Sequence, residues 1–119
     1  MKVKQILNRI YVNDMEQTIN FYEKLLNEKC NMIFQYAQAN LELAQISNIL
    51  IICGPDDALK IVNDTKLTFL VDSVKEYKDF LLKNGVAVIR DIKEVPTGFN
   101  MTVKHLDGTI VEYVEHKNN

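Results

Sequence analysis

The sequence has no tryptophan, two cysteines, two prolines and four glycines among its 119 residues. Cys30 and Cys53 lie far apart, in neither a metal-binding nor a redox spacing, so we expect reduced thiols in a cytoplasmic protein. The longest purely apolar run, 49–53, is far shorter than the roughly 20 residues of a membrane-spanning helix. The basic start lacks the apolar segment of a signal peptide. These absences argue against a disulfide-stapled scaffold and against a membrane protein.

An excess of one charge is also missing. The 14 basic and 16 acidic residues are interspersed and give a net charge of −2. A nucleic-acid-binding domain needs a clustered basic face, and a membrane-surface helix needs a charged run, so we expect neither partner. The composition, 47% apolar and 25% charged, is that of a globular protein. A chain of this length buries about 65% of its unfolded surface, so we expect one domain over 1–119.

The first half of the chain contains one helix among strand patterns. Alternation in the first strand places Leu7, Arg9 and Tyr11 on one face, and Asn13-Asp14 offers a cap for the helix. Short connections between the later runs indicate an antiparallel meander, whereas the pattern leaves the connector 58–65 undecided. The expected elements are a strand over 4–12, a helix over 16–26, and strands over 31–36, 39–46 and 48–53.

The same order then starts again. A glycine at position 85 marks the end of the second helix, and Asp107-Gly108 predicts a tight turn between the last two strands. The expected elements are a strand over 66–71, a helix over 74–84, and strands over 86–92, 99–104 and 109–115. The sequence therefore predicts an α+β fold of two βαβββ modules, 1–57 and 66–119, with the helices outside the sheet.

Glu112 has an unusual place in the last strand. Alternation puts it on one face with Ile110 and Val114, while Val111 and Tyr113 lie on the other. A carboxylate among apolar neighbours is either a ligand-binding group in a cavity or a charge at a solvated edge.

Three motifs together resemble those of the vicinal oxygen chelate superfamily, also called the glyoxalase/bleomycin resistance/dioxygenase fold. They lie in 10–26, 69–85 and 105–113, and their order covers nearly the whole chain. The resemblance implies a cupped mixed or antiparallel sheet around a pocket. Family enzymes hold a divalent metal there through residues of the first and last strand of each module, while other members bind a drug without metal, usually as dimers.

The metal ligands implied by the resemblance are mostly missing. The corresponding positions carry Leu7, Lys66 and an apolar residue near Ile51, so Glu112 is the one match. A catalytic metal needs three or more protein ligands, so we expect no metal and no cofactor. Lys66 is expected either to pair with Glu112 and plug the former metal space, or to contact a ligand with it. We expect both histidines, His105 and His116, on the surface.

The aromatic residues divide into two groups. Those at helix-on-sheet positions are expected in the core, whereas the strand faces of Phe34 and Tyr36 are not decided by the pattern. The expected core aromatics are Phe21, Tyr22, Phe69, Tyr77 and Phe80. The expected ligand-binding residues are Arg9, Tyr11, Phe34, Tyr36, Lys66, Met101 and Glu112, with no catalytic residue among them.

The resemblance and the missing ligands favour a cytoplasmic, metal-independent protein that binds an unknown small molecule and forms a homodimer. Two alternatives stay open. One is a metal-dependent lyase or dioxygenase of glyoxalase type with ligands elsewhere in the chain. The other is a degenerate module that serves as an interaction partner.

Overall fold

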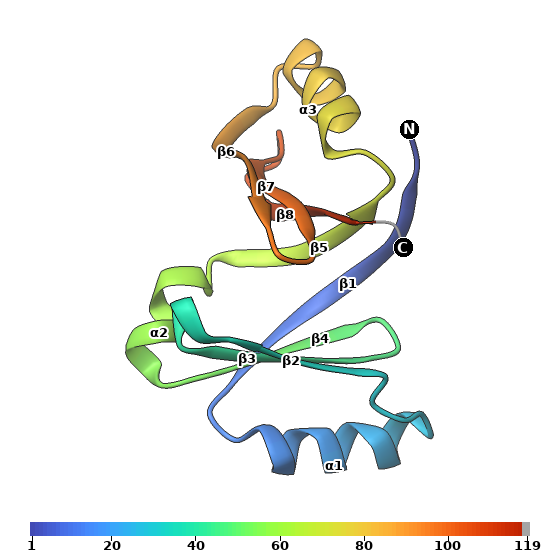
Figure 1. Ribbon diagram of the computed structural model, residues 1–119, viewed down its shortest axis with the longest axis vertical. Helices are drawn as coiled ribbons and strands as arrows, with labels where there is room; N and C mark the ends of the chain where they lie inside the picture. Colours follow the sequence, from blue (N-terminus) through green and yellow to red (C-terminus); the bar gives the residue numbers. More distant parts are fainter. Residues whose placement is uncertain (118–119) are drawn as a thin grey trace. The chain divides into compact units, whose positions relative to one another are not determined.

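The computed structural model describes residues 1–117, which group into two compact units (Figure 1). We call residues 8–64 the N-terminal unit; the C-terminal unit combines residues 1–7 with the chain from Thr65 onward. No helix among residues 1–117 is long and apolar enough to cross a membrane.

The N-terminal unit is a four-stranded mixed sheet with the order β2-β3-β4-β1. Strands β1 and β4 are parallel, and the β2–β3 and β3–β4 pairs are antiparallel, as the meander predicted. The undecided connector contains a helix, α2. The elements are β1 (Val3–Val12), α1 (Met15–Leu26), β2 (Met32–Tyr36), a 3₁₀ turn (Ala37–Ala39), β3 (Leu41–Ile46), β4 (Ile49–Cys53) and α2 (Asp56–Val62).

The C-terminal unit repeats this arrangement with the strand order β1-β5-β8-β7-β6. Here β5 and β8 are parallel, and β6–β7 and β7–β8 are antiparallel. The elements are β5 (Thr65–Val71), α3 (Val74–Lys83), β6 (Ala87–Val95), β7 (Gly98–Lys104) and β8 (Ile110–His116). The predicted α+β class and the two βαβββ modules are confirmed.

Strand β1 takes part in both units. Its second half, from Asn8, is in parallel register with β4. Its start lies with β5, where the backbone N–H of Lys2 donates to the Asp72 carboxylate and the Asp72 N–H donates to the Lys2 carbonyl. One continuous strand therefore belongs half to each unit.

The two long helices begin as the sequence predicts. The Asp14 carboxylate accepts a hydrogen bond of 3.0 Å from the Gln17 backbone N–H, and the Ser73 hydroxyl accepts one of 3.2 Å from the Glu76 N–H. Such side chains satisfy N–H groups that have no partner within the helix. Each cap fixes where its helix leaves the preceding strand.

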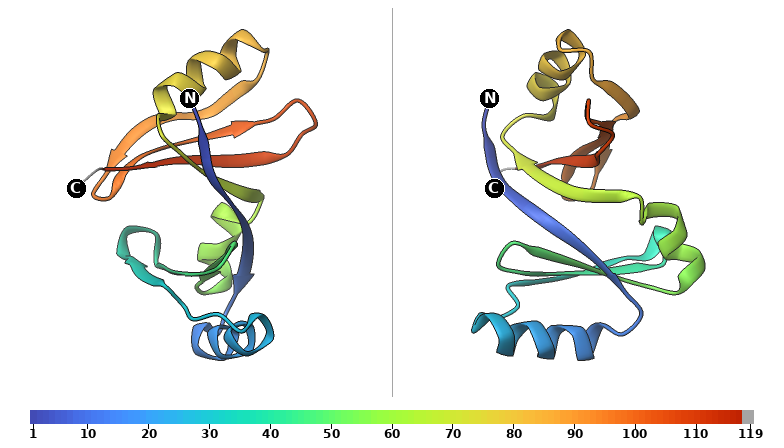
Figure 2. Two further views of the ribbon diagram at one scale, coloured as in Figure 1. Left: turned by 90° about the vertical axis from the view of Figure 1, so that its right-hand side faces the viewer. Right: turned by 180° about the vertical axis from the view of Figure 1, so that it is seen from behind.

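Each long helix covers one face of its own unit's strands. Met15, Ile19 and Tyr22 of α1 pack against Ala44 and Ile51, and Figure 2 shows α1 running along these strands. In the other unit, α3 buries a larger cluster made of Val71, Val74, Leu81, Val86, Met101, Val103, Val111 and Tyr113. Because strand side chains alternate, each unit has a second face turned away from its long helix, which we call the helix-free face because neither α1 nor α3 covers it.

The expectation for the aromatic core is only partly right. Tyr22, Phe69 and Tyr77 pack against the clusters, but Phe21 and Phe80 are 57% and 45% exposed. Phe21 is adjacent to Tyr22 along α1, and a step of about 100° per residue turns it out of the inward stripe. The expectation of a buried Phe21 and Phe80 was therefore wrong.

Candidate functional site

Glu112 lies on the helix-free face of the C-terminal unit. Its neighbours Val111 and Tyr113 are 0% and 3% exposed in the cluster under α3, so alternation turns Glu112 the other way. The strand register places Thr68 of β5 on one side of it and Thr102 of β7 on the other. The Glu112 side chain is 25% exposed. A half-buried carboxylate thus has hydroxyl-bearing residues on both flanks.

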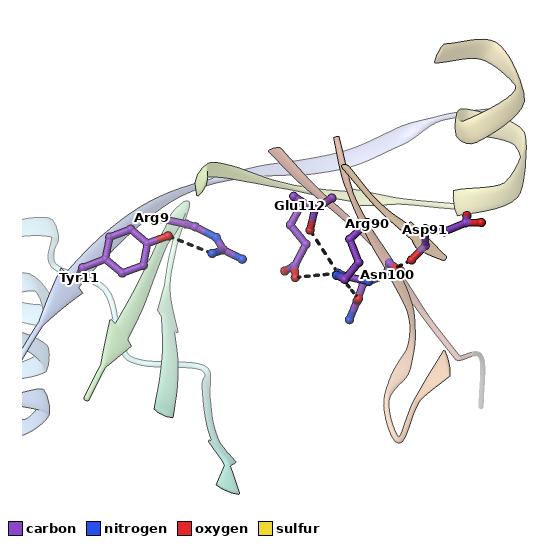
Figure 3. A network of polar contacts seen from close by, with 7 residues as sticks. Arg9, Tyr11, Arg90, Asp91, Asn100 and Glu112 are labelled. Atoms are coloured by element: carbon purple, nitrogen blue, oxygen red, sulfur yellow. Dashed lines mark hydrogen bonds and ion pairs between the residues drawn. The ribbon is translucent and has the colours of Figure 1, made fainter. Parts of the chain in front are cut away.

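Arg90 of β6 connects this carboxylate to the neighbouring strands (Figure 3). Its Nη2 lies 3.8 Å from Glu112 Oε2, an ion pair, and donates to Asn100 Oδ1 at 2.6 Å and Thr102 Oγ1 at 3.2 Å. Its Nη1 donates to the backbone carbonyls of Asp91 and Asn100. Since these bonds fix the planar guanidinium, Arg90 holds a positive charge in a set position beside Glu112.

The sequence left two roles open for Lys66, and the first of them, a pair with Glu112, was wrong. The second, a contact with a ligand, stays a prediction. The pairing of β5 with β8 shifts between Thr65 and Leu67, so Lys66 lies in a β-bulge and is exposed. A bulge inserts one residue and reverses the alternation beyond it. Thr68, which is 2% exposed, takes the place beside Glu112, and Arg90 supplies the charge.

Met101, another expected ligand contact, lies in the core of the C-terminal unit. It is fully buried in the cluster under α3, opposite Tyr113 in the β7–β8 register. Directly opposite residues share a face, so Met101 points away from Glu112, while Thr102 lies beside it. Met101 therefore does not share the face of Glu112, and its expected contact with a ligand stays a prediction.

His105 has an internal role that the sequence did not predict. Its Nε2 lies 2.8 Å from the Tyr113 hydroxyl, and its ring meets Phe69 edge-on with centroids 5.7 Å apart. Burial raises the pKa of Tyr113 to about 12. The expected surface position was wrong for His105, whereas His116 is exposed. His105 helps to anchor β8, the strand that carries Glu112.

On the helix-free face of the N-terminal unit, Arg9 and Tyr11 form a second polar group, also drawn in Figure 3. Arg9 Nη1 donates to the Tyr11 hydroxyl at 3.0 Å, and that hydroxyl donates to the Val62 carbonyl at 2.8 Å. Val62 is the last residue of α2. The sequence correctly placed Arg9 and Tyr11 on one face, but it did not predict the helix that fixes them.

Phe34 and Tyr36 belong to the same helix-free face. They lie opposite Leu43 and Leu41 in the β2–β3 register, and their ring centroids are 6.4 Å apart. Phe34 is 37% exposed. The structure thus assigns the face that the sequence left open, and it groups two aromatic rings with aliphatic side chains.

A divalent metal does not fit these residues. Among residues 1–117, no three His, Cys, Asp or Glu side chains gather where they could hold a metal ion. Leu7 is 2% exposed and Ile51 is fully buried under α1, and neither offers an oxygen or nitrogen donor from its side chain. The single carboxylate, Glu112, already faces a guanidinium. A cation beside Arg90 would be repelled, so the donor set around Glu112 is unsuited to a divalent ion.

The sequence reasoning missed Arg90 and Asn100. Arg90 follows three apolar residues of a strand pattern, 87–89, which was the available signal. Its side of the strand depends on the β6–β7 register, which shifts twice.

The neighbour of Arg90 in β6, Asp91, faces α3. A hydrogen bond from Lys78 of α3 holds the pKa of the Asp91 carboxyl below its usual value. Arg90 and Asp91 therefore extend to opposite sides of β6.

Comparison with known proteins supports the fold. No family model matches the chain, and no curated protein matches its sequence. A methylmalonyl-CoA epimerase from Mycobacterium tuberculosis is 15% identical with a TM-score of 0.77, over 98% of this chain and 90% of that one. A hypothetical protein from Bacillus halodurans is 18% identical with a TM-score of 0.78, over 99% and 96%. The chain thus has the fold of the vicinal oxygen chelate superfamily.

A much more similar structure is that of an uncharacterized protein from Methanosarcina mazei. It is 48% identical, has a TM-score of 0.88, and the match covers 100% of this chain and 97% of that one. The chain belongs to the same family as this Methanosarcina mazei protein.

Proposed function

We propose that this protein binds a small organic molecule without a metal ion, and that Glu112 holds a polar group of that molecule. The observation that carries the proposal is the ion pair between Glu112 and Arg90. A metal-dependent site would need further ligands around Glu112, and no such group of side chains occurs among the described residues. A carboxylate without a metal is an acceptor for N–H and O–H groups. The bound group is therefore an amine, an amide or a hydroxyl.

Arg90 acts in this proposal as a positioning residue. Its two terminal nitrogens donate to Asn100, Thr102 and the Asp91 carbonyl, so the guanidinium is held by three further residues. Arg90 thus keeps the Glu112 carboxylate in a set orientation through the ion pair between them. The hydroxyls of Thr68 and Thr102 flank the carboxylate and can add hydrogen bonds to the same ligand.

The N-terminal unit offers contacts of a different kind. Among the alternate residues of β1 to β4 that share its helix-free face, all within the described chain, Arg9 is the one charged side chain. The others include Tyr11, Phe34, Tyr36 and Leu43. Apolar surface with few polar groups is typical of small-molecule sites. We propose that these residues form a second contact surface, within the N-terminal unit alone, for an apolar small molecule, and that Arg9 contacts an anionic group of that molecule.

A ligand screen on the purified protein tests this function. Thermal unfolding is measured with methylmalonyl-CoA and with a set of aromatic and aliphatic amines, amides and alcohols, each with and without EDTA. We expect at least one compound to raise the melting temperature equally in both conditions. Glu112→Gln should abolish the shift, because the amide replaces an acceptor oxygen by a donor. Glu42→Gln is the matched control, since Glu42 lies on β3, away from Glu112, and accepts a hydrogen bond from Gln35 of β2.

Measuring the metal content of the purified protein can overturn the proposal. Protein purified without chelator is analysed for Ni, Zn, Fe, Mn and Co. A stoichiometric ion that is lost in Glu112→Ala would overturn the metal-independent proposal.

The second candidate is a metal-dependent enzyme, favoured by the methylmalonyl-CoA epimerases among the similar folds. Assays with methylmalonyl-CoA, hemithioacetal and catechol substrates, each with added Ni²⁺, Zn²⁺ or Fe²⁺, distinguish the two. Turnover that requires Glu112 would establish the enzyme.

A further inference from the structure

Arg90 uses its terminal N–H groups within the protein. Its Nη1 donates to the backbone carbonyls of Asp91 and Asn100, and its Nη2 donates to Asn100 Oδ1 and Thr102 Oγ1. Each terminal nitrogen of a guanidinium carries two hydrogen atoms, so both nitrogens are fully used. The charge of Arg90 also faces the Glu112 carboxylate at 3.8 Å. An anionic ligand would have to displace bonds already made and would meet the charge of Glu112.

The same guanidinium sets the orientation of the Asn100 amide. Asn100 Oδ1 accepts the 2.6 Å bond from Arg90, so the NH₂ group, Nδ2, is the other end of the amide. Within residues 1–117 no hydrogen bond uses Nδ2, and no buried side-chain nitrogen or oxygen lacks a partner, so Nδ2 is in contact with solvent. An amide NH₂ group is a hydrogen-bond donor. Asn100 therefore offers a donor in a fixed position that a ligand can reach.

Asn100 and Glu112 lie on the same face of the sheet. Thr102 is opposite Glu112 in the β7–β8 register, and Asn100, two residues before Thr102, shares its face. Arg90 Nη2 lies 2.6 Å from Asn100 Oδ1 and 3.8 Å from Glu112 Oε2, so both side chains meet at one nitrogen (Figure 3). Diagonal neighbours of this kind are close enough to contact one small molecule together.

We propose that Asn100 is a second ligand contact and that, together with Glu112, it selects a neutral carboxamide. The N–H of the ligand donates to the Glu112 carboxylate, and its C=O accepts from Asn100 Nδ2. This inference rests on the small-molecule function proposed above and names the chemical class of the ligand.

Other polar groups satisfy the pair less well. An amine has no acceptor for Asn100, and an ester has no donor for Glu112. A carboxylate lacks the donor and also meets the charge of Glu112. A hydroxyl must reach both side chains from one oxygen, whereas an amide uses two atoms.

A matched series of phenyl compounds tests this class. The series is phenylacetamide, phenethylamine, phenylacetate, methyl phenylacetate and 2-phenylethanol, which differ in the polar group. Binding is followed by the backbone amide signals of ¹⁵N-labelled protein up to about 20 mM, since compounds this small bind in the millimolar range. We expect phenylacetamide to shift signals of β7 and β8 and to bind at least about fivefold tighter than each of the others, because each loses a hydrogen bond.

Asn100→Asp tests the donor itself. The variant keeps Oδ1 for Arg90 and replaces the Nδ2 donor with an acceptor oxygen. Its preference should change by about tenfold from phenylacetamide to 2-phenylacetamidine, whose two nitrogens are both donors. A purely structural role of Asn100 would weaken both compounds equally.

Lys93→Gln is the matched control for charge. Lys93 lies opposite Asn100 in the β6–β7 register, and this substitution lowers the net charge by the same unit without changing Asn100. The control should keep the wild-type preference for the amide. Circular dichroism verifies that both variants are folded.

Three outcomes overturn the inference. One is a change of preference in Lys93→Gln as large as that in Asn100→Asp, which would assign the effect to charge alone. Another is an equal loss of both compounds in Asn100→Asp. The third is phenylacetamide binding that is absent, or no tighter than that of the other compounds. An amine or alcohol that binds and requires Glu112 would then leave the small-molecule function standing, whereas a negative result in the wider ligand screen would count against that function itself.

Discussion

Because the hydroxyl of Tyr113 is buried, we expect the stability of this protein to fall at alkaline pH. Tyr113 is 3% exposed, its hydroxyl lies 2.8 Å from His105 Nε2, and its ring centroid is 5.2 Å from that of Phe69. Burial raises its pKa from the ordinary value near 10 to about 12, because the charged phenolate would lose its hydration. The change proposed is Tyr113→Phe, which removes the ionisable group and keeps the ring.

The magnitude follows from the difference between the two pKa values. The neutral hydroxyl is favoured in the folded state, so this contribution to the free energy of unfolding is fully present below pH 10 and is lost as the pH rises towards 12. Two pKa units correspond to about 2.7 kcal/mol, of which about 1.4 kcal/mol is lost by pH 11. At pH 8 the substitution itself should cost about 1 kcal/mol, because His105 loses a hydrogen-bond partner.

Urea unfolding followed by circular dichroism at pH 8, 9, 10 and 11 measures these quantities. Between pH 9 and pH 11 the free energy of unfolding of Tyr113→Phe should fall by about 1.4 kcal/mol less than that of the wild type. Met101→Leu is the control, since Met101 lies in the same cluster and does not ionise. It should keep the wild-type pH slope even where it lowers stability.

Equal slopes for the wild type and Tyr113→Phe would refute the reasoning. They would mean that the hydroxyl ionises in the folded protein as readily as in the unfolded chain. The position of Tyr113 under α3, and with it the orientation of β8, would then need revision.

Four further substitutions test the packing around the site by urea unfolding. Gly98→Ala would place a Cβ in a clash with the Glu115 carbonyl oxygen, so we expect the free energy of unfolding to fall by about 3 kcal/mol, and a loss below about 1 kcal/mol would contradict the β7–β8 register. Met101→Ala should lower the free energy of unfolding by about 3 kcal/mol because it leaves a cavity, and the folded variant should still bind the compounds found in the ligand screen. A selective loss of that binding would support Met101 as a ligand contact. Arg90→Met should cost about 2 kcal/mol, since it removes the hydrogen bonds that tie β6 to β7, and a neutral result would show that the network adds no stability. Ser73→Ala should cost about 1 kcal/mol by removing the cap of α3, and an unchanged midpoint would exclude that cap in solution.

The fold could be predicted from the sequence because each element carries a local signal. Asp14 and Ser73 mark the two helix starts, and the turn at 107–108 and the alternation after it define β8. These signals depend on neighbours within a few residues. The inward stripe of α1 was harder to define, since Phe21 and Tyr22 are adjacent and equally apolar, and only packing selects between them.

The site could be predicted less well because it depends on register between strands. Glu112 was placed on the correct face from its own strand. Its neighbours come from β5, β6 and β7, and a bulge at Lys66 and two shifts in β6 change which residues face it. Because of the one inserted residue, Thr68 and not Lys66 lies beside Glu112. The register of β7 with β8, which the sequence did not reveal, puts Thr102 and not Met101 beside it. No single-strand pattern contains this information.

The sharing of β1 between the two units affects how the chain is made. Residues 1–7 leave the ribosome before the rest of the described chain, but their strand neighbour β5 starts only at Thr65. At roughly 5 to 20 residues per second, the start of β1 waits about 3 to 12 seconds before β5 has been synthesised. The N-terminal unit can complete its pairing during this interval, since β4 precedes β5 in the chain. Synonymous codons that slow translation just after residue 64 would prolong the exposure of Val3 to Leu7 and should increase their cleavage by protease in a translating extract.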